Sequence, residues 1–501
     1  MAATNSSLER KAERLRKQIE VKRLQNTLRA YEAAQPSDYH SRRNVDSRSG
    51  DGAMDYAGAK LRNLARYLDE NHDIAGAILD DVVDGVVGSG INTLPAVKTT
   101  SGELADDLNE QISALYEDWA QAPEVTAELP WGEAQRLVLR SMLRDGELFV
   151  QHISGGRLDH RTRIPYSQEL IEADYCPFDY DAGGYRHGVL KDAWGRPLTY
   201  AFYLEHPGDS DWTAVSQVKT VSADRITHLK FVKRLRQTRG VPLLANVITR
   251  LEDLKDLEES KRIQERIAAA FSAAIIKGDP TAYDQNAALS DGSRAFEMAS
   301  GIIFDNLMPG EQIQTLGSDR PGTGLGDWRK DQIRAAAGGT RAKYSSVARD
   351  YAGSYSSQRQ ELVEAEYRYR PFRDYFCTRY LMRTHRELIN AAIASGVLRI
   401  PQSIDRETLY DCDFQGPAMP WIDPEKELNA IEKALALDIT TKRDEQIKRG
   451  QNPRRIDEQR AKEKAAAIEQ AQAMAPAQAE LNLEGGQDDG QDDGQGASAA
   501  A

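Results

Sequence analysis

The sequence predicts an α+β protein in which long helices flank a strand-rich central region. Between Pro242 and Gly278, apolar residues recur every three or four positions, which is the spacing of one amphipathic helix of about 36 residues. Short aromatic and β-branched runs, broken by Gly, Pro and Asp, occupy residues 147–229 and predict strands. Helical periodicity resumes on both sides of these two segments. A helix this long with a narrow apolar stripe is unusual in a compact monomeric enzyme. It is better explained as a strut that packs against copies of itself or crosses a large assembly.

The composition limits the classes of function. The chain has 501 residues, of which 40% are hydrophobic, and a formal net charge of −13. This acidic charge argues against a protein that binds nucleic acid by neutralising many phosphates. The three cysteines, Cys176, Cys377 and Cys412, fit no metal-ligand spacing and are interpreted as thiols in a reducing compartment. We expect no metal and no cofactor. No apolar run reaches the length of a membrane span, and the charged N-terminus lacks a signal-peptide core.

The N-terminal half is expected to contain a basic arm, a linker, three helical segments and a strand region. The arm is interpreted as a solvated amphipathic helix, with binding to an acidic partner or DNA as the alternative. Gly88 to Gly90 should end the first helical segment after the linker. The expected elements are the arm helix 5–33, the linker 36–52, helices 59–90, 103–121 and 131–145, and strands at 148–150, 170–171, 198–202 and 226–229.

The C-terminal half is expected to be mostly helical after a loop-rich stretch. Pro371 should kink the longest of these helices and Gly396 should cap its end. The tail from Pro476 has six acids and no base, so we expect it to be disordered. The expected elements are loops 279–326 with strands at 301–304 and 312–316, helix 327–348 interrupted by Gly338-Gly339, helix 357–395, and helices 423–450 and 453–474.

A legible catalytic set is absent from the sequence. Gly322 to Gly326 is glycine-rich, but no lysine follows in phosphate-loop spacing, and we interpret it as a mobile loop. The eight histidines fit no zinc or metalloprotease spacing. The acids Asp80, Asp81 and Asp84 are interpreted as a solvated helix face rather than a cation site. These absences favour a structural or conduit role over an enzyme.

Five stretches, read in order, resemble the lambda-type portal proteins of tailed bacteriophages. They span residues 55–455, and their order makes the resemblance specific although no single stretch is a catalytic-grade signature. The stretches are Tyr67 to Gly90, ending in DDVVDGVVGSG, Arg239 to Leu244 (RGVPLL) with the charged helix that follows, Leu307 to Glu311 (LMPGE), Asp350 to Arg359, and Pro420 to Pro424 (PWIDP).

The resemblance implies a ring-forming portal fold with long stem helices, a β-rich wing, a clip of loops and strands, and a helical crown. The implied parts are the N-terminal arm and linker 1–54, the wing 55–240, stem helix 1 at 241–278, the clip 279–326, stem helix 2 at 327–347, the tunnel loop 348–357, the kinked wing helix 358–396, the crown region 397–475 and the acidic tail 476–501.

The resemblance also implies which residues carry the function. Three groups are expected to face the DNA, the neighbouring subunit and the packaging motor, respectively. They are the tunnel-loop residues Arg349, Asp350, Tyr351, Tyr355 and Ser356, the stem residues Leu251, Leu254, Glu258 and Arg262, and the clip residues Met308, Glu311, Gln312 and Arg320. For the two tyrosines, packing beneath the loop is the alternative.

The implied partners are a homo-oligomeric ring, dodecameric in this family, and double-stranded DNA passing through its centre. The large terminase subunit, the major capsid or scaffold protein, and neck or head-completion proteins would also bind, and no membrane is involved. The protein would be assembled in the host cytoplasm and would reside at the portal vertex of the virion. Two alternatives stay open: a DNA-packaging enzyme such as a nuclease or ATPase, and a helical scaffold or adaptor.

Overall fold

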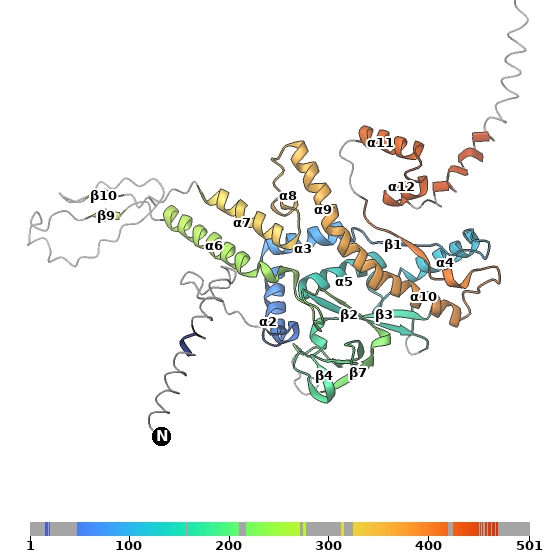
Figure 1. Cartoon of the computed structure of the whole chain (residues 1–501). Coiled ribbons are helices and arrows are strands. Elements are labelled where there is room, and N and C mark those ends of the chain that lie inside the picture. Colours follow the sequence, from blue (N-terminus) through green and yellow to red (C-terminus); the bar gives the residue numbers. More distant parts are fainter. Residues whose placement is uncertain are drawn as a thin grey trace, which may run out of the picture. The chain divides into compact units, whose positions relative to one another are not determined.

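The computed structural model describes residues 48–156, 159–209, 217–270, 274–276, 312–314, 324–418 and 424–449, with single positions between 16 and 20 and between 451 and 468. The chain divides into two units, residues 1–49 and 50–501. The mixed helix-and-sheet architecture of the second unit agrees with the predicted class (Figure 1). No helix in the described part of the chain is long and apolar enough to cross a membrane.

Four helices open this unit. They are α2 (Gly50–Asn71), α3 (Asp73–Val86), α4 (Asp106–Trp119) and α5 (Trp131–Asp145). The single helix expected over 59–90 is wrong, because His72 is extended and caps α3 through the amide of Ile74. The other imidazole nitrogen of His72 lies 3.0 Å from the carbonyl oxygen of Leu251 in the helix that begins at Ile248, which fixes the break between α2 and α3 against that helix. Gly88, at φ +60, ends α3 as expected.

The strand region forms two antiparallel sheets. One has the order β3-β2-β8 and the other β4-β5-β6-β7. Period-2 patterning found β2, β3, β6 and β8, but β4, β5 and β7 were missed because they are short and partly exposed. Their bounds are β2 Glu147–Ser154, β3 Tyr166–Ile171, β4 Tyr185–Arg186, β5 Val189–Lys191, β6 Pro197–Tyr203, β7 Val218–Ser222 and β8 Ile226–Lys230, with short helices η3 Ala173–Tyr175, η4 Ala182–Gly184 and η5 Ala223–Arg225.

The long helix expected between Pro242 and Gly278 is shorter than predicted. A 3₁₀ turn, η6 (Leu243–Asn246), precedes α6 (Ile248–Ala270), which has 23 residues. Beyond it, β9 (Ala274–Ile276) pairs antiparallel with β10 (Gln312–Gln314). β-Branched isoleucines favour a strand as readily as a helix, so periodicity alone could not separate the two. β10 confirms the strand expected at 312–316, whereas the strand expected at 301–304 lies outside the described residues.

The following helices return to the body of the unit. They are α7 (Leu325–Thr340), α8 (Tyr344–Ala348), α9 (Tyr355–Phe376), the π-helical turn η10 (Cys377–Leu381) and α10 (Met382–Ala394). α7 runs through Gly338-Gly339 and ends at Arg341, whose φ is +67. Gly339 permits close packing, since a Cβ there would lie 2.8 Å from Cγ1 of Val247. Pro371 lies inside α9, and Gly396 follows α10 with φ +75 as expected.

The C-terminal part joins the N-terminal helices through a small sheet. β11 (Cys412–Gln415) pairs antiparallel with β1 (Asn92–Pro95), and η11 (Arg406–Thr408) precedes it. The expected helix 423–450 is two helices, α11 (Pro424–Ala436) and α12 (Lys442–Lys448), since Asp438 adopts φ +54 between them. Described positions from 453 to 468 are mostly helical. The acidic tail from Pro476 lies outside the described residues.

Two apolar cores organise the fold. The larger core joins α2 to α5 with one face of β2, the base of α6, α7 and the α9–α10 helices. The smaller core lies between the two sheets and is centred on Phe149, Tyr200 and Phe202, whose rings meet edge to face or stacked. Side chains of β2 alternate between these cores, so the β3-β2-β8 sheet is covered on both faces.

Candidate channel and assembly region

The joint between the strand region and the stem is built from main chain. Gly146 ends α5 with φ +89, and a Cβ on Gly240 would overlap its carbonyl oxygen. The segment Arg239-Gly240 therefore lies directly on Gly146-Glu147, where only glycine permits the approach. This contact fixes the position at which the chain leaves β8 and begins the stem.

A buried ion pair locks this joint. The Arg239 guanidinium, fully buried, donates to Glu147 at 2.6 Å and to the carbonyl oxygens of Ala173, Cys176 and His187 at 2.9–3.1 Å. Glu147 also accepts from the Gly240 amide at 2.9 Å and lies 3.0 Å from His228. Each nitrogen of the guanidinium and each oxygen of the carboxylate has at least one partner, which a buried pair requires if it is to stabilise rather than strain a fold.

Burial and charge act in opposite directions at this site. Burial alone would raise the pKa of Glu147, but Arg239, with His228 and the Gly240 amide, lowers that pKa to about 2. Burial lowers the pKa of His228 to about 4 against the opposing effect of Glu147. At neutral pH, Glu147 is therefore ionised and His228 is neutral. This joint was missed as a site by sequence reasoning; the one signal was an arginine before a glycine at the start of an apolar run.

The base of the stem is buried inside a single chain. Leu251 and Leu254 are 0% and 1% exposed and belong to the larger core, together with Ile333 of α7. The expectation that these two leucines pack between subunits therefore needs correction: the helix α7 and the body of the same chain already cover them. Figure 1 shows α6 and α7 side by side.

The outer faces of the two stem helices remain uncovered. Leu257 and Ile263 of α6 and Trp328 of α7 are exposed large apolar side chains. Glu258 pairs with Arg329 of α7 at 2.6 Å within the chain, and Arg262 is exposed. Of the four stem residues proposed from the sequence, only Arg262 thus lies on the exposed surface of the single chain.

The expected tunnel loop is a short ordered segment between α8 and α9. Asp350 accepts hydrogen bonds from the Tyr344 hydroxyl at 3.0 Å and the Ala352 amide at 3.2 Å. These donors lower the pKa of Asp350, the Ala352 amide contributing most, so it is anionic at neutral pH. Ser354 caps α9 through the Ser357 amide, which starts that helix two residues earlier than expected.

The two tyrosines of this segment are exposed. Tyr351 is 57% exposed and Tyr355 is 51% exposed, so packing beneath the loop is not observed in the single chain. Arg349, at φ +52, and Ser356 are exposed as well. Asp350 is the only half-buried member of the proposed set. The structure thus brings all five proposed residues into one segment, with four side chains directed to its surface.

The loop is anchored to the body through Asp81. Its carboxylate accepts from the Lys343 amide at 2.8 Å and the Tyr369 hydroxyl at 2.5 Å, and Lys343 Nζ lies 3.3 Å away. The interpretation of Asp81 as part of a solvated face is therefore wrong, because this side chain is buried under α8 and α9. Asp80 and Asp84 pair with Arg140 and Arg136, respectively.

Of the four proposed clip residues, Gln312 lies in the part of the chain that the structure describes. Gln312 begins β10, opposite Ile276 of β9. Met308, Glu311 and Arg320 lie outside the described residues. In the described part, Glu172, Asp174 and His206 come close enough to hold a metal ion. The Arg66 guanidinium lies 2.5 Å from Asp174 and 3.6 Å from Glu172, so both carboxylates already form ion pairs with it.

Comparison with known proteins identifies the class. Residues 37–373, more than half of the chain, match the family described as phage portal protein, lambda family. The protein is therefore a phage portal protein, a head–tail connector. It belongs to the lambda family of these proteins, as the sequence resemblance had indicated.

The relatives are distant in sequence. Over 415 residues the chain is 23% identical to the probable portal protein of Halomonas phage phiHAP-1, covering 78% of this chain and 77% of that one. Among solved structures, the neck of the native GTA particle computed with C12 symmetry gives a TM-score of 0.46 at 12% identity, covering 79% of this chain and 94% of that one. The virion of the native gene transfer agent particle gives 0.43 at 11%, with the same coverage.

Proposed function

We propose that this chain assembles as a ring, of twelve copies, around a channel for double-stranded DNA at the unique vertex of the capsid. The terminase would package DNA through the ring during assembly in the host cytoplasm, and neck proteins would close it afterwards. The chain itself would catalyse no reaction. Membership of the portal family supports the ring, and the geometry of the stem supports where copies meet.

The observation that carries this proposal is the uneven burial of the stem. The inner face of α6 is covered by its own chain, while Leu257, Ile263 and Trp328 remain exposed on α6 and α7. Apolar side chains left uncovered on paired helices mark an association surface. In a ring, each stem has a neighbour on both sides, and these three residues would pack there.

The charge of α6 is compatible with DNA passing by. Asp253, Asp256 and Glu259 are exposed on this helix. Carboxylates repel phosphates, so a wall that carries them does not hold the DNA as a row of lysines would. Arg262, which is also exposed on α6, would pair with an acid of the next subunit.

The segment 349–354 with the start of α9 would form the tunnel loop nearest the DNA. Arg349 supports this role through its exposed charge, and Tyr351 and Tyr355 through flat faces with a polar edge. The internal hydrogen bonds of Asp350 and the cap at Ser354 hold the segment in one shape, which a repeated contact with a moving duplex requires.

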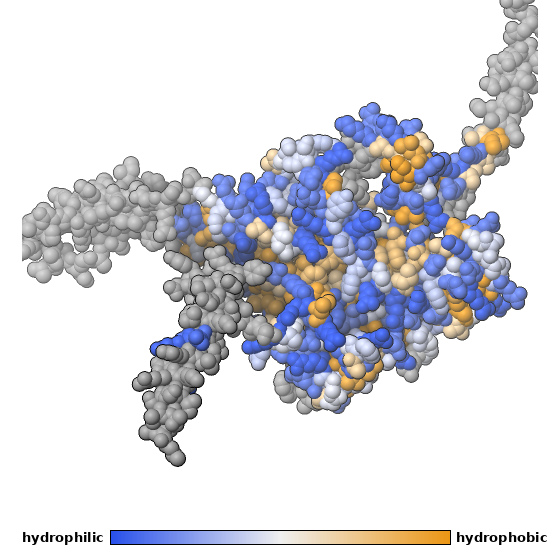
Figure 2. Space-filling view, in the orientation of Figure 1, coloured by the Kyte–Doolittle hydropathy of each residue, from blue (hydrophilic) through white to orange (hydrophobic). Residues whose placement is uncertain are grey.

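The remaining assignments follow the order of the chain. We propose residues 55–240 as the wing, 241–278 as the first stem segment, 279–326 as the clip that meets the terminase, 327–347 as the second stem segment and 397–475 as the crown. The exposed apolar residues Leu428, Leu437 and Ile439, at α11 and just after it, support a further contact between copies there; hydrophobic side chains are visible at α11 in Figure 2.

Electron microscopy of the purified full chain tests the ring directly. We expect ring-shaped particles with a central hole and a mass near 670 kDa by light scattering, twelve times 55.8 kDa. A monomer at all protein and salt concentrations would contradict the proposal. An assay for nucleotide hydrolysis by the same preparation tests the alternative of a packaging ATPase, and we expect no turnover.

The tunnel loop is tested by the double substitution Tyr351→Ala/Tyr355→Ala. We expect intact rings with a lower amount of packaged DNA per particle, because only the surface facing the duplex changes. Tyr367→Ala is the matched control, since Tyr367 is also an exposed tyrosine of α9 but lies three turns further along. Equal DNA content in particles of the unmodified chain, the double variant and Tyr367→Ala would show that the loop does not contact the DNA.

A further inference from the structure

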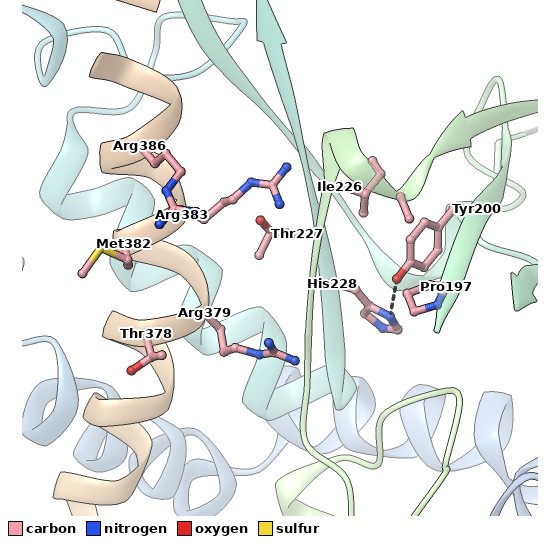
Figure 3. A pocket seen from close by; sticks show the side chains of 11 residues that line it. Pro197, Tyr200, Ile226, Thr227, His228, Thr378, Arg379, Met382, Arg383 and Arg386 are labelled. Atoms are coloured by element: carbon pink, nitrogen blue, oxygen red, sulfur yellow. Dashed lines mark hydrogen bonds between the residues drawn. The ribbon is translucent and has the colours of Figure 1, made fainter. Parts of the chain in front are cut away.

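The open edge of strand β8 lies in a groove that none of the roles above uses. β8 is the last strand of the β3-β2-β8 sheet. Two surface clefts, of about 360 and 560 Å³, run along this edge and share Pro197, Tyr200 and His228. We call their union the β8 groove. Figure 3 shows its first part, with Arg379, Arg383 and Arg386 on one side and Pro197 and Tyr200 on the other.

The edge offers an unpaired backbone position. The Lys230 amide donates to the Tyr375 hydroxyl at 3.2 Å, and its carbonyl accepts from the same hydroxyl at 3.1 Å, so both groups point away from β2. Orientation alternates along an antiparallel strand, so the amide and carbonyl of His228 point the same way. Within the described residues, no group pairs with them. An added strand would find both partners at His228.

The helix side of the groove is cationic. Arg379, Arg383 and Arg386 follow one another at helical spacing along η10 and α10. Arg383 pairs with Glu387 at 3.0 Å, and Arg386 lies over the Tyr410 ring. Arg379 makes no hydrogen bond or ion pair with the described residues. Three guanidiniums with one neighbouring carboxylate form a site for further acidic groups.

The far end of the groove carries exposed apolar side chains among basic ones. Trp194 is 81% exposed and Leu235 is 96% exposed, and Val232 beside them is also exposed. Large apolar side chains that are exposed together mark a surface that a partner can cover. The groove is therefore complementary to an extended segment with acidic side chains on one face and apolar side chains on the other.

One segment of this chain has that pattern. Residues 480–484 read Glu-Leu-Asn-Leu-Glu, and Leu481 and Leu483 are the only large apolar residues after Pro476. In a strand the two leucines share one face, and the two glutamates share the other with Asn482. The tail contains no lysine or arginine to oppose Arg379. Acidic segments with few apolar residues can become ordered when they bind such a surface.

We propose that residues 480–484, from the same chain or a neighbouring copy, dock as an added strand on the open edge of β8. Their acidic face meets Arg379 and Arg383, and their leucines cover Tyr200 and the Trp194–Leu235 end of the groove. The acidic tail is then a latch on the wing region. The inference stands independently of the ring.

Peptide binding tests the latch. The full chain carrying L481S/L483S, which removes the internal competitor, is titrated with a fluorescent peptide of residues 476–490. We expect saturable binding that weakens about tenfold with Arg379→Glu and severalfold with Trp194→Ala. Arg161→Glu, at an exposed arginine on the β2–β3 connection, is the control and should bind normally. The same peptide with both leucines changed to serine should not bind.

The hydrogen-exchange rate of the His228 amide gives a second test, because electrostatic attraction of the tail alone would not change that rate. In the full chain, the His228 amide should exchange more slowly than in the L481S/L483S variant, because docking gives it an acceptor. Equal exchange in both chains, or peptide binding that ignores Arg379 and Trp194, overturns the proposal. Displacement of the peptide by short duplex DNA that binds more tightly through Arg379 would overturn it too, by assigning the groove to nucleic acid.

Discussion

The wing joint and the stem bury their side chains in opposite ways. At the joint, Arg239 and Glu147 are enclosed by one chain and every polar atom of the pair has a partner. In the stem, the inner leucines are enclosed, but Leu257 and Ile263 are left on the surface. The contrast teaches that a single chain completes the joint by itself, whereas α6 and α7 keep exposed apolar side chains that the neighbouring copies of the proposed ring would cover.

The largest expected effect is at the joint. Arg239→Ala leaves Glu147 as an unpaired buried charge, so we expect a loss of about 3–5 kcal/mol in the free energy of unfolding. Denaturant unfolding measures it. Arg161→Ala, which removes an exposed arginine 3.9 Å from Asp159, should change stability by less than about 0.5 kcal/mol. Similar stabilities for both variants would show that the joint is not the closed unit described above.

The stem leucines separate folding from assembly. Leu251→Ala and Leu254→Ala should each cost about 2–5 kcal/mol, because each opens a cavity in the core of one chain. Leu257→Ala should leave the unfolding of the separated subunit almost unchanged and weaken the oligomer instead. Calorimetry and sedimentation on the same samples distinguish the two effects. If Leu254→Ala dissociated the oligomer without destabilising the subunit, the burial described for that residue would be wrong.

Acid should destabilise the fold through three buried histidines in β2, β8 and α10. Burial lowers the pKa of His228 and His385 to about 4 and that of His152 to about 3. In the folded state these histidines therefore stay neutral at pH values where the histidines of the unfolded chain, with a pKa near 6.5, are already protonated. Stability is therefore full above pH 6.5 and is lost as the pH falls toward 4. Glu147, with its pKa lowered to about 2, adds a second loss below pH 4.5. Melting temperatures across pH 7 to 4 measure this, and His228→Gln should reduce the first loss without abolishing it, because His385 and His152 still contribute.

The smallest expected effect is a change in stability on replacing either of two neighbouring glycines in α7. Gly338→Ala should stabilise by up to about 1 kcal/mol, since alanine favours helices and nothing lies within 4 Å of the added methyl group. Gly339→Ala should lose that gain or destabilise, because its methyl group would lie 2.8 Å from Val247. Thermal unfolding of the two variants is the measurement. Equal gains would mean that α7 and η6 separate easily.

Local patterns predicted much of the fold and little of the site. The α5 helix and β2 follow from periodicity and a terminal glycine, which are short-range signals. The Arg239–Glu147 pair joins residues 92 positions apart, and no local pattern encodes such a contact. Leu251 was assigned to the wrong neighbour for a related reason: a stripe on a helix shows that a face is buried, but not whether its own chain or another copy covers it.

The close approach of Gly146 and Gly240 has a consequence for recombination between related phages. Because two backbones touch there with no room for a side chain, a crossover that takes one glycine segment from each parent would place unmatched surfaces against each other. Exchanges that carry residues 146–147 and 239–240 from the same parent should give viable chimaeras. The segment from α6 onward would then be inherited as one unit, and under the proposed assignments its contacts with the packaging motor would be inherited with it.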